Sequence, residues 1–474
     1  MSKKGESLLE DKLDSKTKLL YGISNLGSGT VSGIFATSLI FFYVEKLLLD
    51  EIYIAWAFTF YAIWNAVNDP LFGWLSDKTR TRWGRRIPYL RIFTPLLAIS
   101  FILVWFSPTT GEIGQFGVFV WLLLSMLFYD TAYTASYLVY CALGQELSMD
   151  HGERAKAQAI SMGLQFIGTI ISLLLPDLFL EDPGTMSFLL LVIILAIMQL
   201  ITMGITSLTI KERLEFSHVD EPLGIYQAFK HTIKSKSFII TVLTNFCMIF
   251  VQSVVLGNLF FTINYVYWGW SSTTIILLFG GLLIVGIVIG MIYILKIDAK
   301  MGLKTALLRS ILFLGIGLIL LGALPDLLAL IGIFVMGIGF AGVMTLMNTA
   351  FGEVADEDEV KTGVRREAAI FGTNSLITKP AQSVAGAFIA LMLVFFGYQA
   401  PIGGVPQQQT DFTVLGLKLA IGIIPGLVIL AAGLIFLLYP LHGSYLTEIK
   451  TKMNSMHAEK KKKYDSTYPR ELKK

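Results

Sequence analysis

The sequence predicts an all-α membrane protein whose twelve transmembrane helices form two halves of six. Hydrophobic residues make up 54% of the 474 residues and charged residues only 15%, whereas about 25% of the residues of a soluble domain are charged. The apolar residues fall in long blocks, and basic residues gather in alternate connectors between them. The longest charged connector inside the chain separates six blocks from the other six.

Each apolar block is long enough to form a transmembrane helix, which needs roughly 18 to 20 residues to cross the hydrocarbon core. The twelve predicted spans cover residues 19–47, 52–76, 88–107, 115–143, 156–180, 186–209, 237–266, 273–296, 305–323, 326–351, 368–397 and 412–440. An even number of spans places both termini on the same side of the membrane.

The distribution of Lys and Arg supports this topology. The connectors that follow even-numbered spans contain Lys78, Arg80, Arg82, Arg85, Arg86, Arg154, Lys211, Lys234, Lys300, Lys361, Arg365 and Arg366. The alternate connectors contain essentially no basic residue beyond Lys46. Because basic loops stay inside, we expect a multi-pass protein of the plasma membrane with both termini in the cytoplasm.

The connector between spans six and seven divides the chain into two similar parts. We expect a cytoplasmic N-terminus at 1–18, helical halves at 19–209 and 237–440, a cytoplasmic connector at 210–236 and a basic tail at 441–474. Internal similarity supports the division, because a Gly- and Lys-containing loop follows span two near Gly73 and span eight near Gly302. Two such halves are typical of transporters that work by alternating access.

Several classes of function are excluded by missing motifs. The sequence has no GxxxxGK[ST] nucleotide-binding loop and no metal-spaced Cys and His cluster. None of its five histidines falls inside a predicted span, and Cys141 and Cys247 lie in apolar blocks, where packing is their expected role. We therefore expect no enzyme, no cofactor, no bound metal and no nucleic-acid partner, and energy that comes from an ion gradient or from the solute itself.

Two cytoplasmic blocks carry a resemblance to a known family. The first runs from Asn68-Asp69-Pro70 through Asp77 to Gly84-Arg85-Arg86, and the second runs from Gly352-Glu353 through Asp356 to Arg365-Arg366-Glu367. Together they resemble the glycoside-pentoside-hexuronide:cation symporters of the major facilitator superfamily, the family of melibiose permease. The resemblance extends over nearly the whole chain and implies the major facilitator fold.

The resemblance also implies a cation site between spans two and four. Asp69 matches an acid of that site, Thr134 matches its threonine, and Lys379 matches a nearby lysine of span eleven. Asn65 stands where the family has a second acid, and Tyr137 stands roughly where it has a third. The sugar-holding acid and arginine of the family fall near Gly29 and Met162.

The position of Asp69 predicts its role. It lies about eight residues into span two, roughly 12 Å from the loop, where ionisable groups are costly and usually functional. Lys379, near the middle of span eleven, is its expected partner, and a cation that binds Asp69 would release the lysine. A permanent structural ion pair is the alternative. Because Asp69 is the one family carboxylate left, we expect H⁺ slightly ahead of Na⁺ as the coupling ion.

A second polar stripe lies on span four, where Asp130, Thr134 and Tyr137 share one helical face. Substrate contact, a second proton site and a structural hydrogen bond remain equal alternatives for Asp130. The candidates for the substrate cavity are Asp130, Tyr137, Asn25, Tyr61, Trp64, Gln165, Gln252 and Asn348.

Charged cytoplasmic residues form a predicted gate. Arginines of the loop after span two can pair with acids of other cytoplasmic loops in one conformation only. The predicted gating residues are Asp77, Arg82, Arg85, Arg86, Glu153, Asp356, Arg365 and Arg366.

These features predict a secondary active transporter that moves a small organic solute with a monovalent cation, H⁺ or Na⁺, by alternating access. The family resemblance makes a glycoside or related sugar the expected solute. A lipid-like or amphiphilic solute is the alternative within transport, and a receptor that keeps the fold without transporting is the alternative outside it. The lipid bilayer is the expected environment, and a monomer is the expected state.

Overall fold

The computed structural model describes residues 12–79, 81–145, 147, 151–175, 186–210, 232–267, 272–325, 328–363, 367–402 and 406–467. Within these ranges the chain is almost wholly helical, and the pairing of Thr81 with Gly84 is an isolated bridge rather than a strand. The predicted all-α membrane fold is confirmed.

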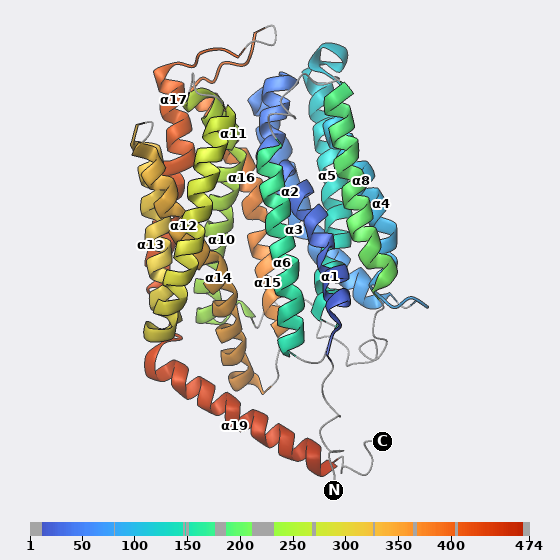
Figure 1. The fold of residues 1–474 in the computed structure, drawn as a ribbon, viewed down its shortest axis with the longest axis vertical. Helices are drawn as coiled ribbons and strands as arrows, with labels where there is room; N and C mark the ends of the chain where they lie inside the picture. Colours follow the sequence, from blue (N-terminus) through green and yellow to red (C-terminus); the bar gives the residue numbers. More distant parts are fainter. Residues whose placement is uncertain are drawn as a thin grey trace. The chain divides into compact units, whose positions relative to one another are not determined.

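Helices occupy the first six predicted spans in order, as the colours of Figure 1 show. The first span comprises α1 (Ser15–Gly22), α2 (Ser24–Phe41) and the π-helical turn η1 (Phe42–Lys46). The next five are α3 (Glu51–Lys78), α4 (Ile87–Trp105), α5 (Thr110–Gln145), α6 (His151–Leu174) and α8 (Met186–Thr209).

The later chain repeats this order. Its helices are α10 (Lys236–Gly257), α11 (Leu259–Phe261), η3 (Thr262–Val266), α12 (Ser272–Met301), α13 (Leu303–Ala323), α14 (Ala329–Thr362), α15 (Glu367–Thr378), α16 (Pro380–Phe395), α17 (Asp411–Lys418), η5 (Leu419–Ile423) and α18 (Ile424–Phe436). In the described part of the chain, ten helical stretches are long and apolar enough to cross a membrane. The long helices α3 and α6, which carry polar side chains along their length, occupy the two remaining predicted positions.

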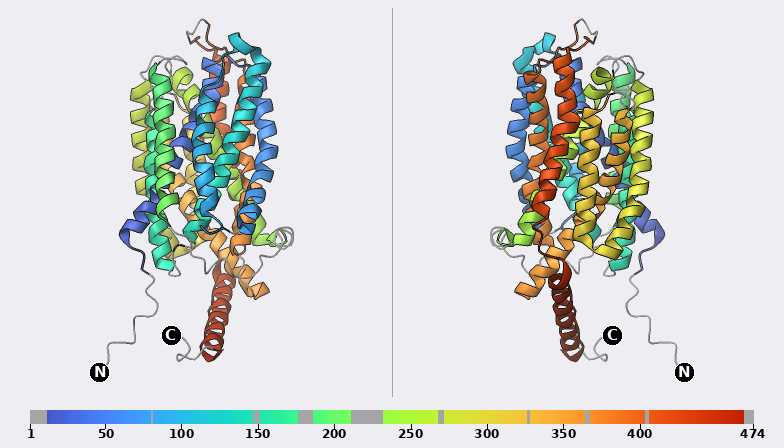
Figure 2. Two further views of the ribbon diagram at one scale, coloured as in Figure 1. Left: turned by 90° about the vertical axis from the view of Figure 1, so that its right-hand side faces the viewer. Right: turned by 90° about the vertical axis from the view of Figure 1, so that its left-hand side faces the viewer.

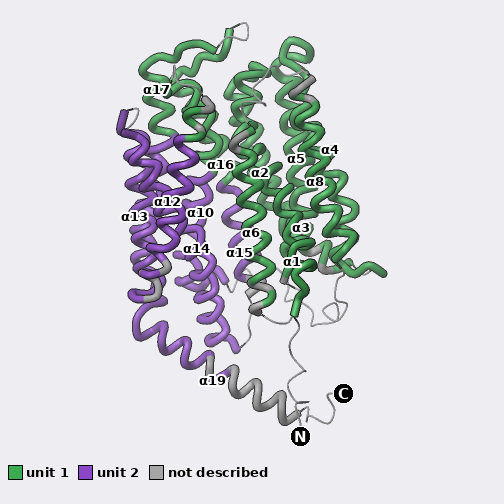
Figure 3. The backbone as a smooth tube through the Cα atoms, viewed as in Figure 1, with its two compact units in different colours: residues 1–221, 253–277, 382–420 green, residues 222–252, 278–381, 421–474 purple. Residues whose placement is uncertain are grey.

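The described residues form two compact units, coloured separately in Figure 3. Unit 1 contains residues 1–221, 253–277 and 382–420, and unit 2 contains residues 222–252, 278–381 and 421–474. Unit 1 therefore combines the first six spans with two stretches of the later chain. The tail helix α19 (Gly443–Thr467) belongs to unit 2 and extends beyond its other helices in both views of Figure 2.

Small residues allow α2 and α6 to pack closely in unit 1. A Cβ atom added at Gly29 would lie 2.5 Å from the backbone oxygen of Gln165, and one added at Gly168 would lie 2.3 Å from that of Leu26. Helices in a bilayer associate through such close contacts because water supplies no hydrophobic drive there. The two glycines thus fix which faces of α2 and α6 meet.

Four spans of the described chain are interrupted rather than continuous. The first ends in the π-helical turn η1, which begins at Phe42, the seventh ends in η3, which follows Phe260-Phe261, and the twelfth contains η5 between α17 and α18. The eleventh breaks at Lys379, because Pro380 has no N–H to continue the hydrogen-bond ladder of α15. Local π-turns and broken helices are frequent at functional sites of membrane proteins.

Candidate functional site

A polar stripe runs along one face of α3 inside unit 1. Tyr61, Asn65, Asn68 and Asp69 occupy positions i, i+4, i+7 and i+8, which share a helical face. All four are buried, with 5%, 2%, 0% and 6% of their surface exposed. Apolar residues on the other side of the helix, such as Ile63 and Val67, are exposed. The helix therefore turns its polar side chains inward.

Asp130 of α5 meets this stripe directly. Its Oδ1 accepts a hydrogen bond from the Tyr61 hydroxyl at 3.0 Å, and its Oδ2 accepts one from the Asn68 amide at 2.7 Å. Beside it, the indole N–H of Trp64 donates to the Thr131 hydroxyl at 3.1 Å. These contacts tie α3 to α5 through side chains that lie more than 60 residues apart in the sequence.

The cluster of Asn65, Asn68, Asp69, Asp130 and Thr134 is rich in oxygen atoms that can bind a cation. Thr134 is 1% exposed, and Asp130 is 5% exposed. Within the described residues, the amide oxygens Oδ1 of Asn65 and Asn68 are buried and accept no hydrogen bond. Carboxylate, amide and hydroxyl oxygens are ligands that hard cations prefer. We call these five residues the α3–α5 cluster.

Lys379 lies at the break between α15 and α16 and is half-buried. Its backbone N–H closes the last turn of α15 by donating to the Ser375 carbonyl at 3.0 Å. Lys379 belongs to unit 2, whereas Asp69 belongs to unit 1. The pairing of Asp69 with Lys379 therefore stays a prediction.

The other predicted cavity residues have different surroundings. Asn25 is buried and donates through its amide to the Ser161 hydroxyl at 2.8 Å, so it contributes to the packing of α2 on α6. Tyr137 is half-buried and stacks on Tyr133, with ring centroids 5.0 Å apart. Gln165 is half-buried in unit 1. In unit 2, Gln252 is half-buried and Asn348 is exposed. Asp130 belongs to the α3–α5 cluster, and Tyr61 donates a hydrogen bond to it.

The basic loop after α3 is held by a tight turn. Thr81 and Gly84 exchange two backbone hydrogen bonds, and Gly84 adopts a φ of 103° that favours glycine. The guanidinium groups of Arg82 and Arg91 lie 4.7 and 4.8 Å from the Trp83 ring centroid, close enough for cation–π attraction. The predicted gating residues Arg85 and Arg86 are half-buried. Arg80, Arg365, Arg366 and the side chain of Asp77 lie outside the described residues.

Glu153, another predicted gating residue, lies at the start of α6. Its carboxylate is 2.5 Å from Lys18 Nζ and 2.8 Å from Lys156 Nζ, and it also accepts from the Leu13 backbone N–H at 3.2 Å. Hydrogen bonds from Lys156 and then Lys18 lower the pKa of Glu153 to about 2. Glu153 therefore holds α1 against α6, a role that its charge alone did not indicate.

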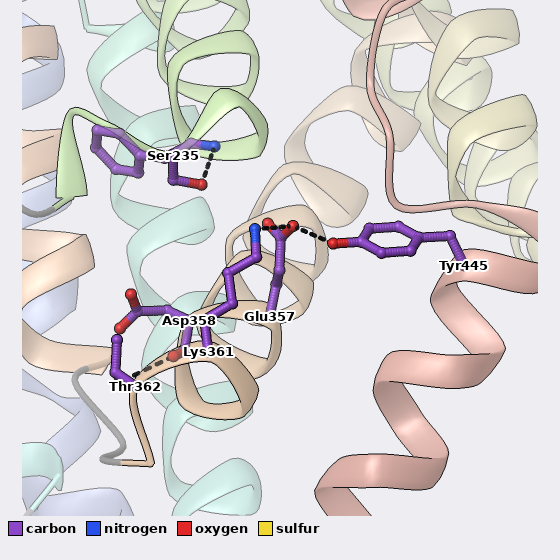
Figure 4. Close-up of polar contacts among 7 residues, drawn as sticks. Ser235, Glu357, Asp358, Lys361, Thr362 and Tyr445 are labelled. Carbon is purple, nitrogen blue, oxygen red and sulfur yellow. Dashed lines mark hydrogen bonds and ion pairs between the residues drawn. The ribbon is translucent and has the colours of Figure 1, made fainter.

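The acidic end of α14 binds the tail helix α19 in unit 2 (Figure 4). Glu357 Oε1 accepts from the Tyr445 hydroxyl at 2.8 Å and pairs with Lys361 Nζ at 2.6 Å. Glu353 accepts from the Tyr439 hydroxyl at 3.2 Å. Asp356, the predicted gating residue between these acids, is half-buried.

A third polar cluster, around Glu45, was missed by the sequence analysis. Glu45 of η1 accepts a hydrogen bond from the Tyr265 hydroxyl at 2.6 Å, and the Tyr398 hydroxyl donates to that of Tyr265 at 3.2 Å. All three side chains are buried, and the rings of Phe41 and Phe261 pack edge to face beside them. The signal was a lone acid at the end of an apolar span, but its partners lie 220 and 353 residues further along the chain.

Comparisons with known proteins agree with this architecture. The family model described as MFS/sugar transport protein matches residues 20–443. The solved nucleoside transporter NupG superposes with a TM-score of 0.62 at 16% identity, covering 89% of this chain and 98% of that chain. A D-xylose-proton symporter superposes with a TM-score of 0.58 at 17% identity, covering 89% of this chain and 97% of that chain.

Relatives in sequence are symporters and a carrier. An uncharacterized symporter of Synechocystis sp. is 30% identical over 173 residues, which is 36% of this chain and only 32% of the relative. The sodium-dependent lysophosphatidylcholine symporter 1 of Xenopus tropicalis is 24% identical over 87% of this chain and 85% of the relative. The glucuronide carrier protein homolog of Escherichia coli is 23% identical over 94% of this chain and 97% of the relative. With the family model matched over most of its length, the chain belongs to the MFS/sugar transport protein family of membrane transporters.

Proposed function

We propose that this protein is a secondary active transporter that carries a small organic solute together with a monovalent cation by alternating access. One observation supports this proposal above the others. Asp69 is 6% exposed within the α3–α5 cluster, and a buried intramembrane carboxylate is costly unless it serves binding or transport. Asp69 is the proposed coupling residue, with Asn65, Thr134 and Lys379 as the other proposed members of the cation site.

The proposed solute is a glycoside or related sugar, as the family description suggests. A lipid-like or amphiphilic solute is the second candidate, and two observations favour it. Gly29, near which the sugar-holding acid of the family falls, has its Cβ direction filled by the Gln165 backbone oxygen at 2.5 Å. Met162, near which the arginine of the family falls, is 49% exposed. Uptake of both solute classes into the same proteoliposomes distinguishes the two candidates.

The proposed cycle uses one gate at each side of the membrane. Both termini and the basic loops are assigned to the cytoplasm, and the chain to the plasma membrane as a monomer. The proposed inner gate consists of Asp77, Arg82, Arg85, Arg86, Glu153, Asp356, Arg365 and Arg366. Glu45, Tyr265 and Tyr398 form the proposed outer gate, because η1 lies at the opposite end of the first span from α1. The halves 19–209 and 237–440 would move relative to each other when these gates alternate.

Replacement of Asp69 by Asn tests the proposed coupling. Asp69→Asn keeps the shape of the side chain and removes its titratable charge, so neither H⁺ nor Na⁺ should bind productively. We expect concentrative uptake to be lost while exchange of solute for solute persists, because exchange need not release the cation. Asp411→Asn, at an exposed position in the first turn of α17, is the matched control. A well-folded Asp69→Asn protein that accumulates solute as the wild type does would show that Asp69 is not the coupling residue.

A further inference from the structure

The loop after α3 carries a high density of positive charge. Residues 78–91 contain no acidic residue and six basic residues, Lys78, Arg80, Arg82, Arg85, Arg86 and Arg91. Topology and the proposed inner gate give a role to this charge as a whole. Neither explains why two of the arginines meet at one tryptophan, so that arrangement is a separate feature of the loop.

The side chains of Arg82 and Arg91 converge on Trp83. Their guanidinium carbons are 4.7 and 4.8 Å from its ring centroid, so the two cations are separated by less than the Debye length of about 10 Å at 0.1 M salt. Like charges at that separation repel each other, and an anion that contacts both removes the repulsion. The cluster of Arg82, Trp83 and Arg91 therefore favours a bound anion.

Both arginines have hydrogen-bond donors to offer to such an anion. Within the described residues neither Arg82 nor Arg91 forms an ion pair, and the one printed hydrogen bond is that from Arg91 Nε to the Ser207 carbonyl at 3.4 Å. This bond caps the last turn of α8. It uses one of the five N–H donors of a guanidinium group, so the terminal nitrogens of Arg91 and the whole group of exposed Arg82 are available.

Apolar residues beside this cluster face the bilayer. Ile92, Pro95 and Ile99, at positions i, i+3 and i+7 of α4, are exposed on one side of the helix. An exposed apolar stripe on a membrane span is a surface for lipid chains. Arg91 directly precedes this stripe, and Trp83, a residue type enriched at membrane–water interfaces, is 44% exposed in the adjoining loop. The cluster therefore lies at the depth of lipid headgroups.

Phosphate is the anion that fits this position. A guanidinium group binds phosphate through paired N–H···O bonds, so two such groups can bind several oxygens of one phosphate. A phospholipid would place its phosphate at the arginines and its acyl chains along the exposed stripe of α4. Soluble phosphate compounds share the phosphate but have no chains for that stripe. Basic segments next to a span also attract anionic lipids in preference to neutral ones.

We propose that Arg82, Trp83 and Arg91 form a binding site for the phosphate group of an anionic phospholipid, whose acyl chains lie on the stripe of Ile92 and Ile99. The inference goes beyond the proposed function, because a lipid site at this loop requires neither the cation site nor the solute. It also gives Arg82 a contact in addition to its proposed role in the inner gate.

Quenching of tryptophan fluorescence by brominated lipids tests the inference on the purified full-length protein. Brominated phosphatidylglycerol, which is anionic, and brominated phosphatidylcholine, which has no net charge, are titrated in micelles of a non-ionic detergent. We expect stronger quenching by phosphatidylglycerol in the wild type and no such difference in Trp83→Phe. Trp56→Phe is the matched control and should keep the difference, because Trp56 is 53% exposed near the other end of α3.

Arg91→Gln should weaken the binding of phosphatidylglycerol about fivefold, the factor that one basic residue contributes near an anionic surface. Arg82→Gln should weaken it by a similar factor. It replaces Arg91→Gln if loss of the contact with Ser207 destabilises that variant. Arg309→Gln is the matched control, because Arg309 is a half-buried arginine near the start of α13, and it should bind as the wild type does.

The possible outcomes separate the lipid site from its rivals. Equal quenching by the two lipids in the wild type, or wild-type affinity for phosphatidylglycerol in both arginine variants, overturns the inference. Loss of the extra quenching when inorganic phosphate is added at constant ionic strength would assign the site to a soluble phosphate compound and overturn the lipid. Asp69→Asn should bind phosphatidylglycerol as the wild type does, so failure of the proposed coupling leaves this inference standing.

Discussion

The hydrogen bond between Glu45 and Tyr265 is expected to hold the proposed outer gate closed. At 2.6 Å it is a short O–H···O hydrogen bond. A typical hydrogen bond contributes about 0.5 to 1.5 kcal/mol, which corresponds to a factor of about 2 to 12 in an equilibrium between two states. Tyr265→Phe should therefore increase the open fraction of the gate by about that factor. Glu45→Gln, which keeps an acceptor but loses the charge, should have a smaller effect in the same direction.

Cysteine accessibility can measure this change. Ser38 is 3% exposed and lies seven residues before Glu45, about 10 Å further along the helix axis. We would introduce Ser38→Cys in a background where Cys141 and Cys247 are replaced by Ser, and label it with a membrane-impermeant thiol reagent added outside. Labelling should be slow in the parent protein and faster in both gate variants.

Tyr293→Phe is the matched control, because Tyr293 is 40% exposed on α12 in unit 2. The double variant Glu45→Gln/Tyr265→Phe should open the gate little more than Tyr265→Phe alone, since both changes remove the same bond. Equal labelling of Ser38→Cys in the parent protein and in both gate variants, with folding intact, would refute the outer gate. Additive effects of the two changes would refute the direct bond as its cause.

Two further predictions concern the ends of the helices. The lowered pKa of Glu153 means that its ion pairs stabilise the fold fully above the usual carboxylate pKa of about 4.5 and lose that contribution as the pH falls toward about 2. Thermal unfolding of Glu153→Gln should therefore show a lower Tm than the wild type near neutral pH, and the difference should shrink on acidification; a difference independent of pH would contradict this. Tyr445→Phe removes the 2.8 Å bond to Glu357 and, at about 1 kcal/mol for such a bond, should speed amide hydrogen exchange in the first turns of α19 several-fold. Unchanged exchange there, relative to the Tyr293→Phe control, would show that α19 is held by other contacts.

Much of the fold could be predicted from local sequence patterns. A bilayer requires every backbone polar group to be satisfied within the helix, so a long apolar block can cross it in essentially one form. Most of the described helices accordingly begin and end close to the predicted spans, whereas α14 continues to Thr362, beyond the predicted end of its span at residue 351. Asp69 and Asn65 could also be identified as candidate site residues from local sequence patterns, because their burial depends on their depth in a span and on the periodicity along one helix.

The breaks inside individual spans were harder to predict from the sequence. Span eleven was expected to be continuous over 368–397, although Pro380 follows Lys379 and cannot continue the hydrogen-bond ladder of a helix. The turns η1 and η3 carry no comparable residue, because a π-turn depends on how neighbouring helices pack against the span.

Contacts between helices depended on the tertiary structure. Periodicity shows which residues of α3 share a face, but it does not show which residues of α5 they meet. The sequence therefore left three roles open for Asp130. Only the packing of α3 against α5 brings Tyr61 and Asn68 to that acid. The same holds for Glu45, whose partner Tyr265 lies 220 residues away. A sequence records the neighbours of a residue along its own helix, whereas the partner across the interface is selected by packing of small residues such as Gly29 and Gly168. The spans and the buried acid of α3 were therefore determined by the sequence itself, and the contacts of Asp130 with Tyr61 and Asn68 were decided by how the helices pack.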